Sequence, residues 1–186
     1  MSDGYLSNQF LIAMPGMTDP NFAQTVTLIC EHGAKGALGI IINRALPMNL
    51  GDVFEQLGLE ATDLELARRP VLSGGPVQTD RGFVVHSPGG EWESTLPFSE
   101  RLHLTTSRDI LNAMAEGRGP RNALVALGYA GWDAGQLDDE MARNAWLNVS
   151  ADERVLFDTP LDDRWREAGR LLGVNLMHMS GDAGRA

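Results

Sequence analysis

The chain has 186 residues, of which 43% are hydrophobic and 22% are charged, and these proportions exclude a disordered protein. Its formal net charge of −10 repels phosphate backbones and argues against direct binding to nucleic acid. Its length favours a single domain spanning residues 1–186, and its one cysteine cannot form an internal disulfide. No apolar run approaches the roughly 20 residues that cross a bilayer, and residues 1–9 do not resemble a signal peptide. We therefore expect a cytoplasmic protein without membrane contact.

The first predicted strand, 10–13, and a loop rich in proline and glycine at 14–22 lead into a hairpin at 25–44. Side chains alternate between the two faces of an extended strand. Four residues of the first hairpin strand therefore share one face: Val26, Leu28, Cys30 and His32. The hairpin places the only cysteine and one of the histidines beside a turn.

The hairpin turn and the returning strand follow directly. Gly33 and Gly36 bracket a short turn in which one residue needs a positive φ. The returning run at 37–43 is nearly all apolar, which is typical of a central strand covered on both faces.

The rest of the chain alternates short apolar runs with turn residues. Strands are predicted at 70–73, 82–87, 91–96, 101–106, 122–129 and 146–149. Helices are predicted at 49–57, 107–116, 137–143 and 161–172, the first of them capped by Asn49. Because strands outnumber helices and are mostly not separated by them, the fold class is α+β with a mixed or largely antiparallel sheet.

Four segments together resemble the bacterial YqgE/AlgH family. They are FLIAMPGMTDPNFAQTVTLICEHGAKGALGIIINR, PVLSGGPVQTDRGFVVHS, the run at 121–137 that contains GYAGWDAGQL, and NAWL at 144–147. The resemblance implies an α+β fold whose branched sheet forms a small barrel surrounded by helices. It implies no established activity, although some members carry the label of a transcriptional regulator linked to alginate production. No cofactor is expected. Lys35 departs from the family, in which we expect an acidic or polar residue in this turn.

Cys30 and His32 are the candidates for catalysis. A cysteine becomes nucleophilic when a neighbouring cation lowers the pKa of its thiol. His32 lies two residues further along the strand, about 7 Å away, and is too distant for a direct hydrogen bond unless the chain bends. The alternative is that Cys30 is a small core residue, because free cysteines are often buried.

Two glycine-rich segments are candidates for binding. Ser73-Gly74-Gly75-Pro76 is either a nest for an anion or a structural turn, and it lacks the glycine spacing of a nucleotide loop. The run at 128–132, GYAGW, has the spacing of a nucleophile elbow, but Ala130 stands where the serine belongs, which excludes a serine hydrolase. Tyr129 and Trp132 are expected to form a wall of a groove or to pack in the core.

A metal site is not expected. The histidines at 32, 86, 103 and 178 are far apart, and no metal-binding spacing is present. Cys30, His32 and His86 would converge only if the strand at 82–87 paired beside the hairpin.

The favoured hypothesis is a non-enzymatic binding or regulatory protein with an unknown protein or small-molecule partner. Its pocket or surface would be formed by the hairpin at 25–44 and by turns at 71–86 and 128–137. The candidate binding residues are Asn43, Ser73, Gly74, Gly75, Pro76, His86, Tyr129, Gly131 and Trp132. One alternative is a thiol-dependent enzyme or redox sensor that uses Cys30, with its pKa tuned by His32. A second is a transcriptional regulator that acts indirectly and not by binding DNA itself.

Overall fold

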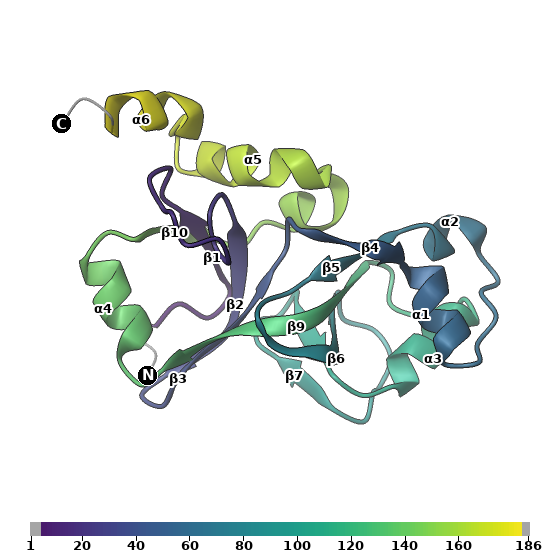
Figure 1. The fold of residues 1–186 in the computed structure, drawn as a ribbon. Coiled ribbons are helices and arrows are strands. Elements are labelled where there is room, and N and C mark those ends of the chain that lie inside the picture. Colours follow the sequence, from purple (N-terminus) through teal and green to yellow (C-terminus); the bar gives the residue numbers. More distant parts are fainter. Residues whose placement is uncertain (1–4, 184–186) are drawn as a thin grey trace.

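The computed structural model describes residues 5–183, whose central element is a ten-stranded sheet (Figure 1). Its strands are β1 (Gln9–Ala13), β2 (Val26–Gly33), β3 (Gly36–Ile41), β4 (Ala45–Asn49), β5 (Pro70–Ser73), β6 (Val77–His86), β7 (Thr95–Pro97), β8 (His103–Thr105), β9 (Ala123–Asp133) and β10 (Trp146–Ser150). The main path through the sheet runs β10-β1-β2-β3-β9-β6-β8-β7.

Strand β9 is the point at which the sheet branches. Its C-terminal part pairs antiparallel with β3, and its N-terminal part pairs antiparallel with β6. The middle of β9 also pairs in parallel with β5, which in turn pairs antiparallel with β4. The sheet is therefore mixed and largely antiparallel, and it curls into a half-barrel (Figure 1).

Helices surround this sheet. They are α1 (Leu50–Gln56), α2 (Leu64–Ala67), α3 (Asp109–Ala115), α4 (Gln136–Ala142), α5 (Arg164–Leu171) and α6 (Leu176–Ala183), together with a π-helical turn at Arg154–Asp158 and a 3-10 turn at Leu161–Asp163. Helices α1 to α3 lie at one end of the sheet and α4 at the other, while α5 and α6 run along a third side (Figure 1). Within residues 5–183, we find no helix with the length and apolar character that a membrane span requires.

Apolar side chains are buried on both faces of the sheet, as β1 illustrates. Phe10 and Ile12 belong to a cluster that also contains Trp165 of α5. The alternate residue Leu11 belongs to a second cluster, which contains Leu137 of α4. Because both faces are covered, β1 is almost continuously apolar, as expected for a strand inside a layered domain.

The predicted hairpin and the first helix are confirmed. Strands β2 and β3 are joined by a tight turn, and Gly36 takes the expected positive φ of 128°. Asn49 caps α1, since its side-chain oxygen accepts from the backbone N–H of Asp52 while the Asp52 carboxylate accepts from the Asn49 N–H. This reciprocal capping box satisfies two donors that a helix start leaves unpaired.

Two predicted turns are wrong in extent. The segment predicted as a turn at 128–137 is mostly strand, because β9 continues to Asp133. In the region 71–86, the predicted strands at 70–73 and 82–87 are confirmed, but the turn is shorter than expected, because β6 begins at Val77 and only residues 74–76 connect it to β5. Gly74, Gly75 and Gly128 suggested turns, but they lie where two backbone segments cross closely. The sequence also does not predict β4, α2 or α6.

Candidate functional site

A groove of about 750 Å³ lies where the β2–β3 hairpin meets the end of β9. Its hairpin side includes Glu31, the turn with Lys35, and Leu38. Its other side is formed by Val77 at the start of β6 and by four residues of β9: Tyr129, Gly131, Trp132 and Asp133. The structure therefore brings three of the predicted binding residues, Tyr129, Gly131 and Trp132, beside the predicted hairpin.

A β-bulge at Cys30 changes the expected alternation along β2. The register with β3 shifts between Ile29 and Glu31, which leaves Cys30 as an extra residue. A bulge reverses the face on which the following side chains lie. Cys30 packs with Leu28 in the cluster beneath α5, whereas His32 contacts α4 through Asp138. The expectation that Cys30 and His32 share a face is therefore wrong.

Cys30 is a core residue. It is 1% exposed, and its thiol lies 3.8 Å from the carbonyl oxygen of Leu28. Burial raises the pKa of the Cys30 thiol far above its ordinary value, and the charge of Glu31 raises it further. A reactive thiolate requires the opposite shift of the pKa and access to solvent, so this environment does not favour nucleophilic chemistry.

We expect Cys30 in the native protein to resist alkylation by iodoacetamide. The burial requires the core to open first, and the open state of a stable domain is rare. Its labelling should therefore be at least about a thousand times slower than in protein unfolded by urea. Mass spectrometry of quenched samples across a range of pH measures both rates. Fast native labelling with a thiolate transition below about 8.5 would instead support the thiol-dependent alternative.

His32 has no free ring nitrogen to act as a catalytic base. Its Nδ1 accepts the backbone N–H of Leu6 at 2.9 Å, and its Nε2 lies 3.4 Å from a carboxylate oxygen of Asp138. The ring also stacks at a tilt against Tyr5, with 5.0 Å between ring centroids. Because its side chain is only 1% exposed, His32 shapes the floor of the groove and ties the N-terminal segment and α4 to the hairpin.

A carboxylate of α4 holds Trp132 in place. One oxygen of Glu140 accepts from the indole N–H of Trp132 at 3.1 Å and from that of Trp146 at 2.9 Å. The other oxygen accepts from the side-chain amide of Gln136 at 3.0 Å. Trp132 is 6% exposed, so it supports the groove wall from behind. The ring of Tyr129, only half-buried, packs edge-on against Phe83.

Ser73-Gly74-Gly75-Pro76 forms a crossing point and not a free anion nest. The N–H of Gly74 donates to the carbonyl of Leu127, and the carbonyl of Gly74 accepts from Ile41. A Cβ placed on Gly75 would lie 2.1 Å from the carbonyl carbon of Tyr129. Only glycine fits at positions 74 and 75, because the backbone of β9 passes directly against them.

Two further predicted residues lie away from the groove. Asn43 connects the chain on either side of the hairpin, accepting from the N–H of Val26 and donating to the carbonyl of Gln24. His86 is fully buried, and its Nε2 lies 2.6 Å from the hydroxyl oxygen of Thr105. Burial lowers the pKa of His86 below its ordinary value. Because β6 pairs with β8 and β9, His86 does not converge with Cys30 and His32.

Among the side chains of residues 5–179, no group of three His, Cys, Asp or Glu residues suited to a metal ion occurs. Sequence analysis missed Glu140 and the buried Arg164 of α5. The pattern of α5 gives no sign that Arg164 is buried, because arginines are usually solvated. The burial arises from contacts with a distant strand.

The comparisons with known proteins agree with one another. A family model described as AlgH-like matches residues 10–177. A UPF0301 protein of Thioalkalivibrio sulfidiphilus is 57% identical over 180 residues, which cover 97% of this chain and 96% of that protein. A UPF0301 protein of Xanthomonas campestris is 51% identical over 181 residues, with coverage of 97% and 96%.

Two solved structures are similar. The solution structure of the AlgH protein from Pseudomonas aeruginosa has a TM-score of 0.78 and 49% identity, and the match covers 93% of this chain and 92% of that one. The crystal structure of DIP2367 from Corynebacterium diphtheriae has a TM-score of 0.73, with coverage of 94% and 91%. At 20% identity, this second match shows a shared fold alone.

Proposed function

The chain belongs to the AlgH-like family, and we propose that it is a non-enzymatic binding protein whose site is the groove between the β2–β3 hairpin and β9. The observation that carries this proposal is the contrast between the groove and the thiol. The groove is open and lined by exposed polar groups, whereas Cys30 is buried on another face of β2. A pocket of this size with a few polar groups is typical of a binding site.

The charges around the groove favour a basic partner. Glu31 and Asp133 are both exposed on its rim, and Asp138 lies beside His32. Among the described residues that line the groove, Lys35 is the only lysine or arginine. Arginine side chains pair with carboxylates through two parallel hydrogen bonds and stack on aromatic rings. We therefore propose that the groove receives an arginine-containing segment of a partner protein, with Tyr129 available for stacking.

A role in regulation would then be indirect. The net charge of −10 opposes contact with DNA and favours contact with a basic protein surface. We propose that this interaction takes place in the cytoplasm, because a chain with one cysteine has no internal disulfide that would require an oxidising compartment. The thiol-dependent alternative is weaker, since the one cysteine has no second thiol to pair with and is buried.

Calorimetric titration with two synthetic peptides tests the proposal. We expect a peptide of alternating arginine and glycine to bind, with an affinity that falls as salt rises. A peptide with glutamate in place of arginine should not bind. The double variant Glu31→Gln, Asp133→Asn should weaken binding of the arginine peptide by about tenfold, because each lost rim pair contributes up to about 1 kcal/mol.

The matched control removes the same charge elsewhere. Glu60→Gln with Glu100→Gln changes two exposed acidic residues that do not line the groove. This control should bind the arginine peptide nearly as well as the unmodified protein. Equal weakening by both double variants would mean a general attraction to an acidic surface, and it would count against the groove as the site.

A further inference from the structure

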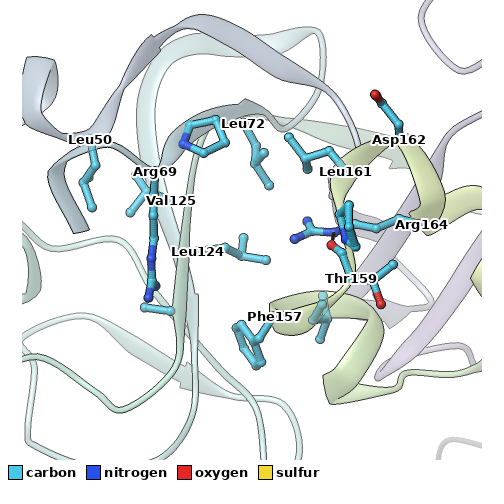
Figure 2. A pocket seen from close by; sticks show the side chains of 14 residues that line it. Leu50, Arg69, Leu72, Leu124, Val125, Phe157, Thr159, Leu161, Asp162 and Arg164 are labelled. Carbon is cyan, nitrogen blue, oxygen red and sulfur yellow. Dashed lines mark hydrogen bonds between the residues drawn. The ribbon is translucent and has the colours of Figure 1, made fainter. Parts of the chain in front are cut away.

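A second cavity, of about 520 Å³, lies between the β5–β9 part of the sheet and the segment that leads into α5 (Figure 2). It shares no lining residue with the groove of the hairpin. Most of its wall is apolar, and the main contributors are Leu50, Leu72, Leu124, Val125, Phe157 and Leu161. Such a wall suits a hydrocarbon group and leaves the few polar groups to fix its orientation.

The guanidinium group of Arg164 is the principal polar group of this cavity. Arg164 is 8% exposed, and its side chain extends from the start of α5 into the cavity (Figure 2). Its Nη1 donates to the carbonyl oxygen of Ile42 at 2.5 Å, and its Nε donates to that of Thr159 at 2.9 Å. These two bonds use two of the five N–H donors of a guanidinium. The remaining donors are available in a largely buried position.

Among the side chains that the structure describes, no carboxylate balances the positive charge of Arg164. Within residues 5–179, no acidic side chain lies within salt-bridge distance of its guanidinium group. Burial lowers its pKa to about 10, so it stays charged at neutral pH. Buried charges are ordinarily paired, because an unpaired ion loses its hydration without compensation. The neutral carbonyls of Ile42 and Thr159 supply only part of this compensation.

The other charged residues of the cavity do not neutralise Arg164. Asp162 is exposed, and its carboxylate points away from the guanidinium (Figure 2). Arg69 lies on the opposite side of the cavity and adds a second positive charge (Figure 2). The cavity is therefore a local positive region in a protein whose net charge is −10.

We propose that this cavity binds a small organic anion, whose carboxylate or phosphate pairs with Arg164 and whose hydrocarbon part lies against the leucine and phenylalanine wall. Charge-assisted bonds between a guanidinium and such groups are among the strongest hydrogen bonds in proteins. Arg69 would strengthen the binding from the rim. A purely structural role for Arg164, tying α5 to the chain after β3, predicts lost stability in its variants but no response to added anions.

Titration of the whole chain with four eight-carbon probes separates these roles. Octanoate and octyl phosphate carry the anionic group, whereas octanol and octylamine carry the same tail without it. We expect at least one anion to raise the melting temperature and to bind saturably with one site in calorimetry. Whichever of octanoate and octyl phosphate binds more tightly shows whether the site prefers a carboxylate or a phosphate. No anion binding, or equal binding of octanol, would overturn the proposal.

Variants locate the binding. Arg164→Gln should weaken anion binding by at least about tenfold, since a hydrogen bond to a charged group is worth roughly 1.5–3 kcal/mol, which corresponds to about 10- to 150-fold.

Leu124→Trp fills the cavity but keeps Arg164, so it tests the site even if Arg164→Gln does not fold. It should also abolish binding. Arg69→Gln should have a smaller effect. Unchanged anion binding in Leu124→Trp would overturn the proposal. Binding should be unaffected by Glu31→Gln with Asp133→Asn, which makes it independent of the proposed function of the groove.

Discussion

Replacing Gly75 by alanine is expected to destabilise the protein by about 3 kcal/mol, the largest effect of any single methyl group that we predict. Gly75 has a positive φ of 153°, and its added Cβ would lie 2.1 Å from the carbonyl carbon of Tyr129 and 2.2 Å from the oxygen. The neighbouring atoms are backbone, so no flexible side chain is able to move aside. The reciprocal contact is equally close, because a Cβ on Gly128 would lie 2.4 Å from the carbonyl oxygen of Gly75.

Urea unfolding measures this loss as a lower free energy of unfolding, and a thermal scan should show a melting temperature lower by about 6–12 °C. Gly82→Ala is the matched control. Gly82 lies seven residues further along the chain, in β6, where a Cβ would meet nothing within 4 Å. Its replacement should change the free energy of unfolding by no more than about 0.5 kcal/mol. Similar losses in Gly75→Ala and Gly82→Ala would mean that the close crossing of β9 does not explain the glycines.

Replacing Glu140 by alanine is expected to cost about 2 kcal/mol. The substitution leaves the indole N–H groups of Trp132 and Trp146 without their acceptor, and an unsatisfied buried donor costs about 1–3 kcal/mol. Water replaces the two lost hydrogen bonds only in part, because both tryptophan side chains are buried. Urea unfolding followed by tryptophan fluorescence measures the change, and the indole N–H signals of Trp132 and Trp146 should shift in NMR spectra.

Two variants serve as controls for Glu140. Glu140→Gln keeps an acceptor oxygen without the charge, and it should recover most of the lost stability. Asp139→Ala removes a neighbouring exposed carboxylate of α4 and should be nearly neutral. If Asp139→Ala were as damaging as Glu140→Ala, the loss would reflect helix charge in general and not the bonds to the two indoles.

The parts of the fold that depend on local patterns could be predicted from the sequence. The hairpin of β2 and β3, the positive φ of Gly36 and the capping box of Asn49 each follow from a few neighbouring residues. The fold class followed from the order of such elements. These features are local because they are set by backbone sterics and by hydrogen bonds within one turn.

The parts of the fold that depend on contacts between distant residues could not be predicted from the sequence. A bulge leaves no reliable mark in a single sequence, so the shift at Cys30 that separates it from His32 was not expected. Glycines at a crossing look like glycines in a turn, which explains why 128–137 was assigned wrongly. The burial of Arg164 depends on the carbonyl of Ile42, which lies far away in the sequence. Three residues that line the groove, Tyr129, Gly131 and Trp132, were predicted from the sequence, whereas the cavity around Arg164 was found only in the structure.

Mapping the arginine–glycine peptide by NMR shows directly whether the hairpin groove is the binding surface. Backbone amide signals of the ¹⁵N-labelled protein are followed as the peptide is added. We expect the largest shifts at residues 31–38 and 129–133, which line the groove from two sides, and little change around Arg164. Shifts spread evenly over the acidic surface, or concentrated away from these two segments, would mean that the groove is not the binding site.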